Sequence, residues 1–164
     1  MFSLKIWSYC VSLHHKVTNF FFMKDYLKYW RPVRYFVQSK YNLSAPDLEF
    51  LLFLRSEKYF DKNKFDEFNE LISWDKNRFE SLRERGWIEK FRNAKKGKRA
   101  VYKLSYKANR MLTSVYKKLE GEEIPESEGS NPLFRNNVPY MDKVYRNFIK
   151  RMNKFTRQQR YHVD

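Results

Sequence analysis

Glycine, cysteine and histidine are scarce in this chain of 164 residues, and each shortage excludes a class of site. Four glycines are too few for a glycine-rich phosphate loop, and no Walker, GxGxxG, GxSxG or HExxH motif is present. The single cysteine, Cys10, excludes an intrachain disulfide and fits a reducing compartment such as the cytoplasm. The three histidines lack the spacing of a zinc site on a helix. The sequence therefore predicts no enzyme, no metal and no cofactor.

Long hydrophobic runs are also missing. Residues 1–22 are rich in apolar side chains, but lysines and histidines interrupt them, so no run approaches the roughly 20 residues that cross a bilayer. The segment also lacks the apolar stretch and the cleavage site of a signal peptide. We interpret it as a poorly ordered leader, with the alternative that it lies upstream of a natural start at Met23. We expect no membrane contact.

Acidic residues are few beside the basic ones. The chain has 34 lysines and arginines against 19 aspartates and glutamates, a formal net charge of +15 at pH 7. This excess indicates a polyanionic partner, with nucleic acid ahead of an anionic membrane. Aromatic residues make up 19% of the chain, so it has the material for a core and is no disordered tail. The length suits one domain with extensions.

Six segments are predicted to be helices from apolar spacing, helix caps and terminating glycines. Pro32 lies inside the first, where we expect a kink or a break. Ser44 with Asp47, Ser73 and Ser105 are predicted N-caps of the second, fourth and fifth. The predicted helices cover residues 23–40, 45 to about 57, 62–71, 74–85, 106–119 and 139–159.

Between the fourth and fifth helices the period changes from helical to extended. β-forming residues at 87–91 and 101–104 flank a basic turn at 93–98, which predicts a β-hairpin. From Lys90 to Lys103 there are seven basic residues and no acidic one. Residues 122–138 carry two prolines, a glycine and four glutamates, and are interpreted as a linker or long loop whose glutamates keep it solvated.

Three helices, a basic hairpin and a further helix follow the plan of a winged helix-turn-helix. Residues 43–112 resemble the MarR family of winged-helix regulators, including its small bacteriophage-encoded members. The resemblance is carried by LRERGWI at 82–88 and KRAVYKLS at 98–105. Two departures concern DNA contact: Gly97 stands where the family's hairpin carries aspartate, and the helix before Gly86 is about one turn short.

The resemblance implies a mainly α fold with a small hairpin, organised as residues 23–121 for the winged helix, 122–138 for the linker and 139–164 for a C-terminal amphipathic helix. It also implies a homodimer in which N- and C-terminal helices interlock. The apolar stripe of the final helix supports this, because a partner chain offers the same stripe by symmetry; the alternative is that this helix folds back on its own domain. The predicted dimer residues are Tyr26, Leu27, Trp30, Met141, Val144, Tyr145, Phe148, Met152 and Phe155.

The predicted function is a double-stranded DNA-binding transcriptional regulator. The helix face opposite Phe79 and Leu82 would read the major groove, with Asn77 suited to adenine and Arg78 to guanine. The candidates on this helix are Ser73, Trp74, Asn77, Arg78, Ser81 and Arg85, and those on the hairpin are Arg92, Lys95, Lys96, Lys98 and Arg99. The resemblance places Arg99 in the minor groove, with a phosphate contact as the fallback.

Three alternatives stay open. The helix arginines at 78, 83 and 85 can instead form solvated ion pairs with the glutamates at 80 and 84. The protein can be a non-catalytic structural or adaptor protein that contacts proteins or coats nucleic acid without reading sequence. A small-molecule effector at the dimer interface is compatible with the family, but the aromatic residues of the outer helices are equally explained as dimer core.

Overall fold

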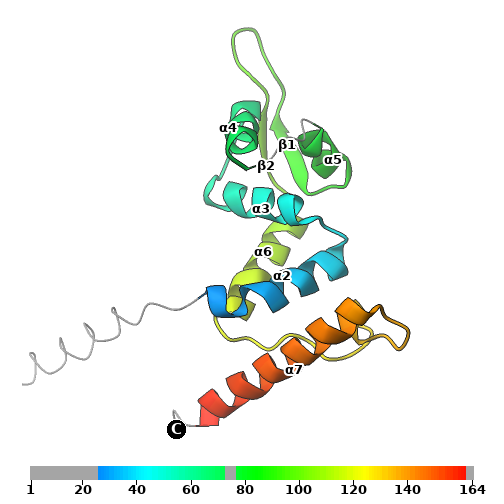
Figure 1. The fold of residues 1–164 in the computed structure, drawn as a ribbon. Helices are drawn as coiled ribbons and strands as arrows, with labels where there is room; N and C mark the ends of the chain where they lie inside the picture. The colour runs from blue at the N-terminus through cyan, green and yellow to red at the C-terminus, as the bar shows by residue number, and fades with distance from the viewer. Residues whose placement is uncertain (1–25, 73–76, 162–164) are drawn as a thin grey trace, which may run out of the picture.

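The computed structural model describes residues 26–72 and 77–161, which form a mainly helical protein with one antiparallel hairpin (Figure 1). This confirms the predicted class, and the order of elements is compatible with a winged helix. The elements are α2 (Leu27–Tyr41), α3 (Ala45–Phe53), the 3-10 turn η1 (Leu54–Ser56), α4 (Lys62–Ile72), α5 (Arg78–Glu84), β1 (Ile88–Arg92), β2 (Val101–Leu104), α6 (Tyr106–Leu119), the 3-10 turn η2 (Pro132–Phe134) and α7 (Tyr140–Tyr161).

The predicted helix ends are confirmed where the caps are local. Ser44 and Asp47 form a reciprocal capping box at the start of α3, and the Ser105 hydroxyl accepts the Ala108 N–H at the start of α6. Gly86 and Gly121 end α5 and α6 with φ of +73° and +103°, a conformation that favours glycine. These caps depend on neighbours in sequence, which is why the sequence predicts them well.

Pro32 does not break α2, which continues without interruption from Leu27 to Tyr41. The missing N–H of Pro32 removes one backbone hydrogen bond, but the turns on its C-terminal side bury Val33, Phe36 and Val37 in the core. Packing therefore outweighs the local cost. Of the kink or break predicted at Pro32, the break does not occur.

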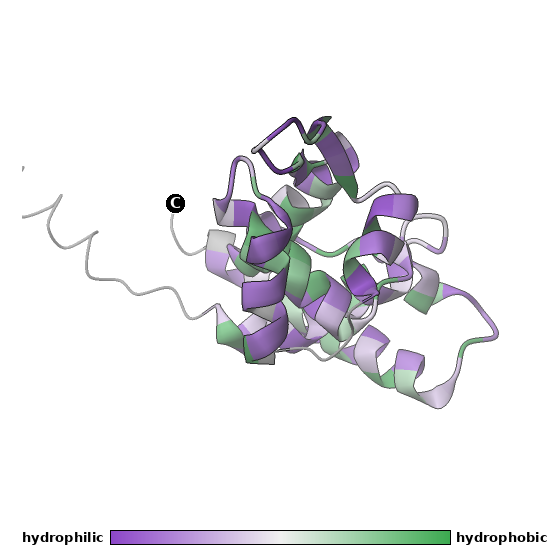
Figure 2. Cartoon of the chain, turned by 90° about the horizontal axis from the view of Figure 1, so that it is seen from above, coloured by the Kyte–Doolittle hydropathy of each residue, from purple (hydrophilic) through white to green (hydrophobic). Residues whose placement is uncertain are grey.

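A series of edge-to-face aromatic contacts links the helices to the hairpin. The ring centres of Phe50 on α3 and Phe65 on α4 lie 5.1 Å apart, and Phe65 lies 5.5 Å from Phe79 on α5. Phe79 in turn lies 4.9 Å from Tyr102 on β2. Figure 2 shows hydrophobic and hydrophilic residues alternating along the helices, as expected when each helix gives one face to a shared core. The aromatic series fixes α5 beside the hairpin.

Residues 122–138 are packed against the helices rather than forming a solvated linker. Ile124, Asn131 and Leu133 in this segment, which we call the strap, are at most 1% exposed. The side chain of Asn131 bonds to the backbone on both sides of the turn before η2. Its oxygen accepts the Leu133 N–H, and its NH2 group donates to the Pro125 carbonyl. The sequence interpretation of this segment as a linker therefore needs correction, since the strap contributes buried residues to the fold.

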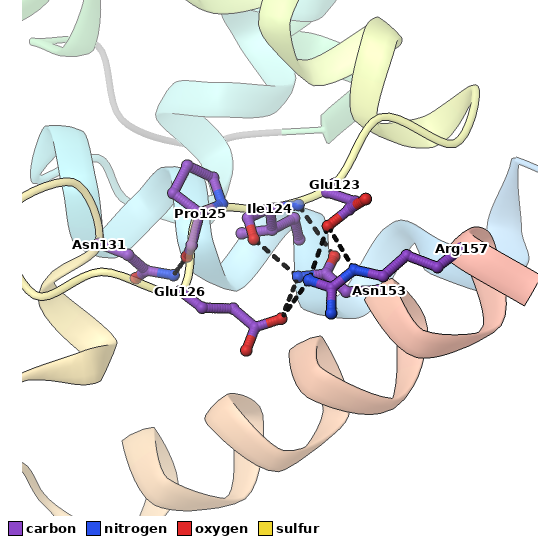
Figure 3. A network of polar contacts seen from close by, with 7 residues as sticks. All are labelled: Glu123, Ile124, Pro125, Glu126, Asn131, Asn153 and Arg157. Atoms are coloured by element: carbon purple, nitrogen blue, oxygen red, sulfur yellow. Dashed lines mark hydrogen bonds and ion pairs between the residues drawn. The ribbon is translucent and has the colours of Figure 1, made fainter.

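Two side chains of α7 contact the strap, as Figure 3 shows. Asn153 is fully buried, and its side chain forms two hydrogen bonds with the backbone of Ile124. It accepts the Ile124 N–H at 3.0 Å and donates to the Ile124 carbonyl at 2.8 Å. Arg157 forms ion pairs with Glu123 at 2.7 Å and Glu126 at 3.3 Å. These two glutamates therefore have a structural contact and do more than solvate the loop.

α7 packs on α2 at the end of the molecule opposite the hairpin tip (Figure 1). The rings of Tyr35 and Tyr145 stack with their centres 3.7 Å apart, and the Tyr35 hydroxyl donates to Asp142 at 2.8 Å. Burial and this hydrogen bond raise the pKa of Tyr35 to about 12. One face of α7 thus folds back on its own chain.

Candidate nucleic-acid interface

The hairpin tip is a tight turn built from lysines and one glycine. Lys95 and Lys98 exchange backbone hydrogen bonds of 3.0 and 2.8 Å across the turn. Gly97 between them has φ of +73°, and a Cβ added there would meet nothing within 4 Å. Its conformation, rather than lack of space, therefore favours glycine. The turn places three lysine side chains, those of 95, 96 and 98, in solvent at the end of the hairpin.

The hairpin cations differ in whether an acidic group compensates them. Lys103 pairs with Glu89 at 3.5 Å, and Arg99 lies 3.9 Å from Asp61 with its side chain 66% exposed. Arg92 and the three tip lysines form no ion pair with any residue of the described ranges 26–72 and 77–161, and all four are exposed. The tip is therefore a patch of like charge, which repels itself unless an anion is nearby.

Asp61 is the acidic residue that lies 3.9 Å from Arg99. It follows Phe60, whose backbone exchanges hydrogen bonds of 3.0 and 2.8 Å with Tyr102 of β2. This bridge brings Asp61 to the side of the hairpin that carries Arg99. No pattern in the sequence indicates the contact, because Asp61 lies 38 positions away from Arg99 and belongs to a different element.

α5 is shorter than predicted in the part that the structure describes, and it begins at Arg78 with Asn77 in the N-cap position. Two of the candidate contacts, Ser73 and Trp74, lie outside the described residues. Phe79 and Leu82 are fully buried, which confirms the predicted inward face. Asn77 and Ser81 are exposed.

Arg78 and Arg85 are held by Asp47 from the first turn of α3. Arg78 Nε lies 3.2 Å from one carboxylate oxygen of Asp47, and Arg85 lies 3.1 Å from the other. Arg85 also donates to the Asn42 carbonyl. The side chains of Arg78 and Asp47 are only 11% and 13% exposed. One carboxylate therefore joins both ends of α5 to α3, and a base contact by Arg78 would require it to leave Asp47.

The alternative of solvated ion pairs along α5 applies to one arginine. Arg83 pairs with Glu80 at 2.7 Å, and both side chains are about two-fifths exposed. Such exposed pairs contribute little to stability. Asp47 is a residue that sequence reasoning assigned only to a helix cap; its spacing from Ser44 explains the cap, and nothing local indicates the two arginines.

The predicted dimer residues fall into three groups by exposure. Tyr145 and Met152 are 8% and 5% exposed because they pack within the chain itself, so little of their surface is left for a partner chain. Val144 and Trp30 are half-buried. The exposed members of the set are Tyr26, Leu27, Met141, Phe148 and Phe155, at 43%, 79%, 50%, 44% and 37%.

An apolar groove of about 600 Å³ lies between α2 and α7. Met141, Phe148 and Phe155 of α7 line it together with Pro32 of α2. Lys28 borders it and lies 4.1 Å from the ring centre of Phe155. The outward face of α7 thus keeps an apolar surface after its other face has been buried.

Within residues 26–72 and 77–161 no three histidine, cysteine, aspartate or glutamate side chains form a group that could hold a metal ion. None of the described helices is long and apolar enough to cross a membrane. The chain matches no family model, no curated protein and no solved structure.

Proposed function

We propose that the chain is a homodimeric, MarR-like winged-helix protein that binds specific sequences of double-stranded DNA in the cytoplasm and regulates transcription. In this proposal α5 enters the major groove, and the hairpin tip contacts phosphates or the minor groove of the flanking DNA. The winged-helix assignment rests on the order of the elements and on the bridge that joins Phe60 to β2 beside the hairpin.

The observation that carries the proposal is the uncompensated charge of the hairpin tip. Arg92, Lys95, Lys96 and Lys98 are exposed, and within the described part of the chain no carboxylate pairs with them. Like charges in such a cluster repel one another, which is unfavourable in the free protein. The phosphates of a duplex would supply the missing counter-charge. Backbone contacts of this kind set position and affinity but carry no sequence information.

In this proposal the exposed face of α5 recognises the base sequence of the DNA. Asn77 and Ser81 share this face, and an asparagine side chain can bond the N6 and N7 edge of adenine. Arg78 and Arg85 are assigned a positioning role instead, because Asp47 already holds their guanidinium groups. This division differs from the sequence prediction, which gave all four residues a direct contact with DNA.

The dimer is supported by the apolar face that α7 leaves uncovered. Met141, Phe148 and Phe155 lie on that face, and Leu27 at the start of α2 is 79% exposed. A two-fold axis beside α7 would pair each exposed stripe with its copy, as in the isologous interfaces of most homodimers. An axis that runs along the length of the molecule, from α7 toward the hairpin (Figure 1), would set two hairpins on one side, where they can contact one duplex.

Selection of bound duplexes from a random pool, combined with light scattering, tests the proposal. We expect an enriched sequence with two-fold symmetry and a mass of about twice 20.3 kDa. The half-site spacing should be near one helical turn of DNA, about 34–36 Å. A pool that stays random while binding remains strong would favour the non-specific coating or adaptor function. A monomeric mass at the concentrations that bind DNA would overturn the dimer.

A further inference from the structure

A polar groove of about 910 Å³ runs along the outer face of α6 beneath the base of the hairpin. It is lined by α6 residues from Tyr106 to Lys117, by the segment from Arg55 to Tyr59, and by Lys103 of β2. The two ends on α6 are eleven residues apart, or about 16 Å at a rise of 1.5 Å per residue. Its volume falls in the range of roughly 300–1,000 Å³ typical of small-molecule sites. None of its residues belongs to the proposed DNA-binding set.

The charges of the α6 groove do not cancel. Two acidic residues line it, but Glu57 pairs with Lys64 at 3.8 Å and Glu122 pairs with Lys118 at 3.1 Å, and neither lysine lines the groove. Lys103 is compensated by Glu89. The groove cations that form no ion pair with a described residue are Arg55, Lys58, Arg110 and Lys117.

Arg55 is fixed by neutral acceptors, so its position is set while its charge remains available. Its NH1 group donates to the backbone carbonyl and the side-chain oxygen of Asn109, at 3.2 and 3.1 Å, and its NH2 group donates to the Thr113 hydroxyl at 3.1 Å. A carboxylate in these places would have neutralised the guanidinium, whereas amide and hydroxyl oxygens leave a full positive charge in a concave site.

A second layer of bonds holds these acceptors in place. The Asn109 amide donates to the carbonyls of Leu104 and Ser105, which turns its oxygen toward Arg55. The Thr113 hydroxyl donates to the Asn109 carbonyl at 2.8 Å, which leaves its oxygen to accept from Arg55. Such support restricts the guanidinium to one orientation, as an anion-binding arginine requires.

The groove also offers an aromatic surface. The Tyr106 ring is 75% exposed at the start of α6, and the guanidinium of Arg110 lies 5.7 Å from its centre. An exposed ring with an arginine beside it is a platform on which a nucleobase can stack. Tyr59 at the other wall is already engaged, since its ring lies 4.4 Å from that of Phe91.

We propose that the α6 groove is a binding site for a free nucleoside phosphate. Arg55, Arg110 and Lys117 bind the phosphates, and the Tyr106 ring stacks on the base. This site is separate from the hairpin tip. In this proposal the chain has two anion-binding surfaces of different kinds, an exposed one for a duplex and a concave one for a small molecule.

Calorimetric titration of the full chain with ADP, adenosine and inorganic phosphate in 50 mM salt tests the site. We expect one ADP per chain, with ADP bound at least tenfold more tightly than either adenosine or phosphate, because only ADP engages both the cations and the ring. Equal affinity for adenosine and ADP, or no heat with ADP at millimolar concentration, would overturn the proposal.

Three variants locate the binding. Arg110→Gln with Lys117→Gln changes two side chains that hold no other element, and should weaken ADP binding at least tenfold while thermal unfolding stays unchanged. Arg55→Gln should have a similar effect on ADP. The matched control is Lys95→Gln, Lys96→Gln and Lys98→Gln at the hairpin tip, which should leave the ADP affinity within twofold. Loss of ADP binding in that control, with the groove variants unaffected, would place the ADP on the hairpin and overturn the proposal.

Discussion

The hairpin tip and the strap are both rich in charge, yet they treat their basic residues in opposite ways. At the strap, Arg157 lies between Glu123 and Glu126, and the buried amide of Asn153 satisfies the backbone beside them. At the tip, within the described part of the chain, Lys95, Lys96 and Lys98 have no such partner. The charges of the strap are paired with residues of the same chain, whereas the charges of the tip are left to interact with solvent or with another molecule.

The basic residues of α5 are intermediate between those of the strap and those of the tip in how far acidic groups compensate them. Its arginines are basic and close to the hairpin, yet Arg78 and Arg85 belong with the compensated class because Asp47 lies between them. A count of basic residues near a predicted recognition helix therefore overestimates the number that can contact DNA. The useful quantity is the number left without an acidic partner once the fold has formed.

The largest expected effect is on DNA binding by the tip. Lys95→Gln, Lys96→Gln and Lys98→Gln together should lower affinity for all duplexes alike and reduce the salt slope by about 3 per subunit, because each phosphate contact contributes about 0.9. Thermal unfolding should not change, since the three side chains are exposed. Binding would be measured by fluorescence anisotropy over a series of salt concentrations.

The control for this variant removes the same charge elsewhere. Lys143→Gln, Lys150→Gln and Lys154→Gln change three exposed lysines of α7, at the opposite end of the molecule. We expect their salt slope to equal that of the wild type. If both triple variants lost affinity equally, net charge rather than the tip would govern binding, and the comparison would break down.

The next effect concerns the strap. Asn153→Ala leaves the N–H and carbonyl of Ile124 without partners in a buried setting, and should reduce the free energy of unfolding by about 2–3 kcal/mol. Urea titration followed by circular dichroism measures the change. Arg157→Gln serves as the comparison, because its exposed ion pairs predict little or no shift of the midpoint. Similar losses in both variants would mean that the ion pairs hold the strap.

Asp47→Asn tests the role of the arginines that α5 holds against Asp47. It keeps the shape of the side chain but removes the negative charge that Arg78 and Arg85 share, so α5 should be held less firmly against α3. We expect a loss of about 1–2 kcal/mol in stability and a flatter sequence preference. Selection from a random duplex pool measures the preference. An unchanged preference would show that the arginines act independently of Asp47.

The sequence predicts the elements of the fold better than the contacts between them. Helix caps at Ser44 and Ser105 and the turns at Gly86 and Gly97 depend on residues a few positions apart, so a linear pattern records them. The basic charge of the hairpin could also be predicted, because the absence of acids between Lys90 and Lys103 is visible in the sequence, although the partners of Arg99 and Lys103 lie outside this stretch.

The contacts that determine which arginines are available could not be predicted. Asp47 lies 31 residues from Arg78, and Arg55 lies 54 residues from Asn109, so only the folded chain brings these pairs together. The strap is a similar case: its prolines and glutamates are typical of a solvated loop, and its burial depends on Asn153 nearly thirty residues away. Composition shows whether a segment is compatible with solvent, whereas contacts with distant residues determine whether it is buried in the fold.

The smallest expected effect is a pH dependence at the junction of α2 and α7. The pKa of Tyr35 is raised to about 12 by burial and by its hydrogen bond to Asp142, against about 10 in the unfolded chain. A raised pKa means that the protonated phenol stabilises the fold, fully below pH 10 and less as the pH rises toward 12. Tyr35→Phe removes this contribution at every pH. The difference in melting temperature between wild type and Tyr35→Phe should therefore be constant up to pH 10 and shrink above it, whereas a difference that stayed constant to pH 12 would mean that folding does not raise the pKa of Tyr35.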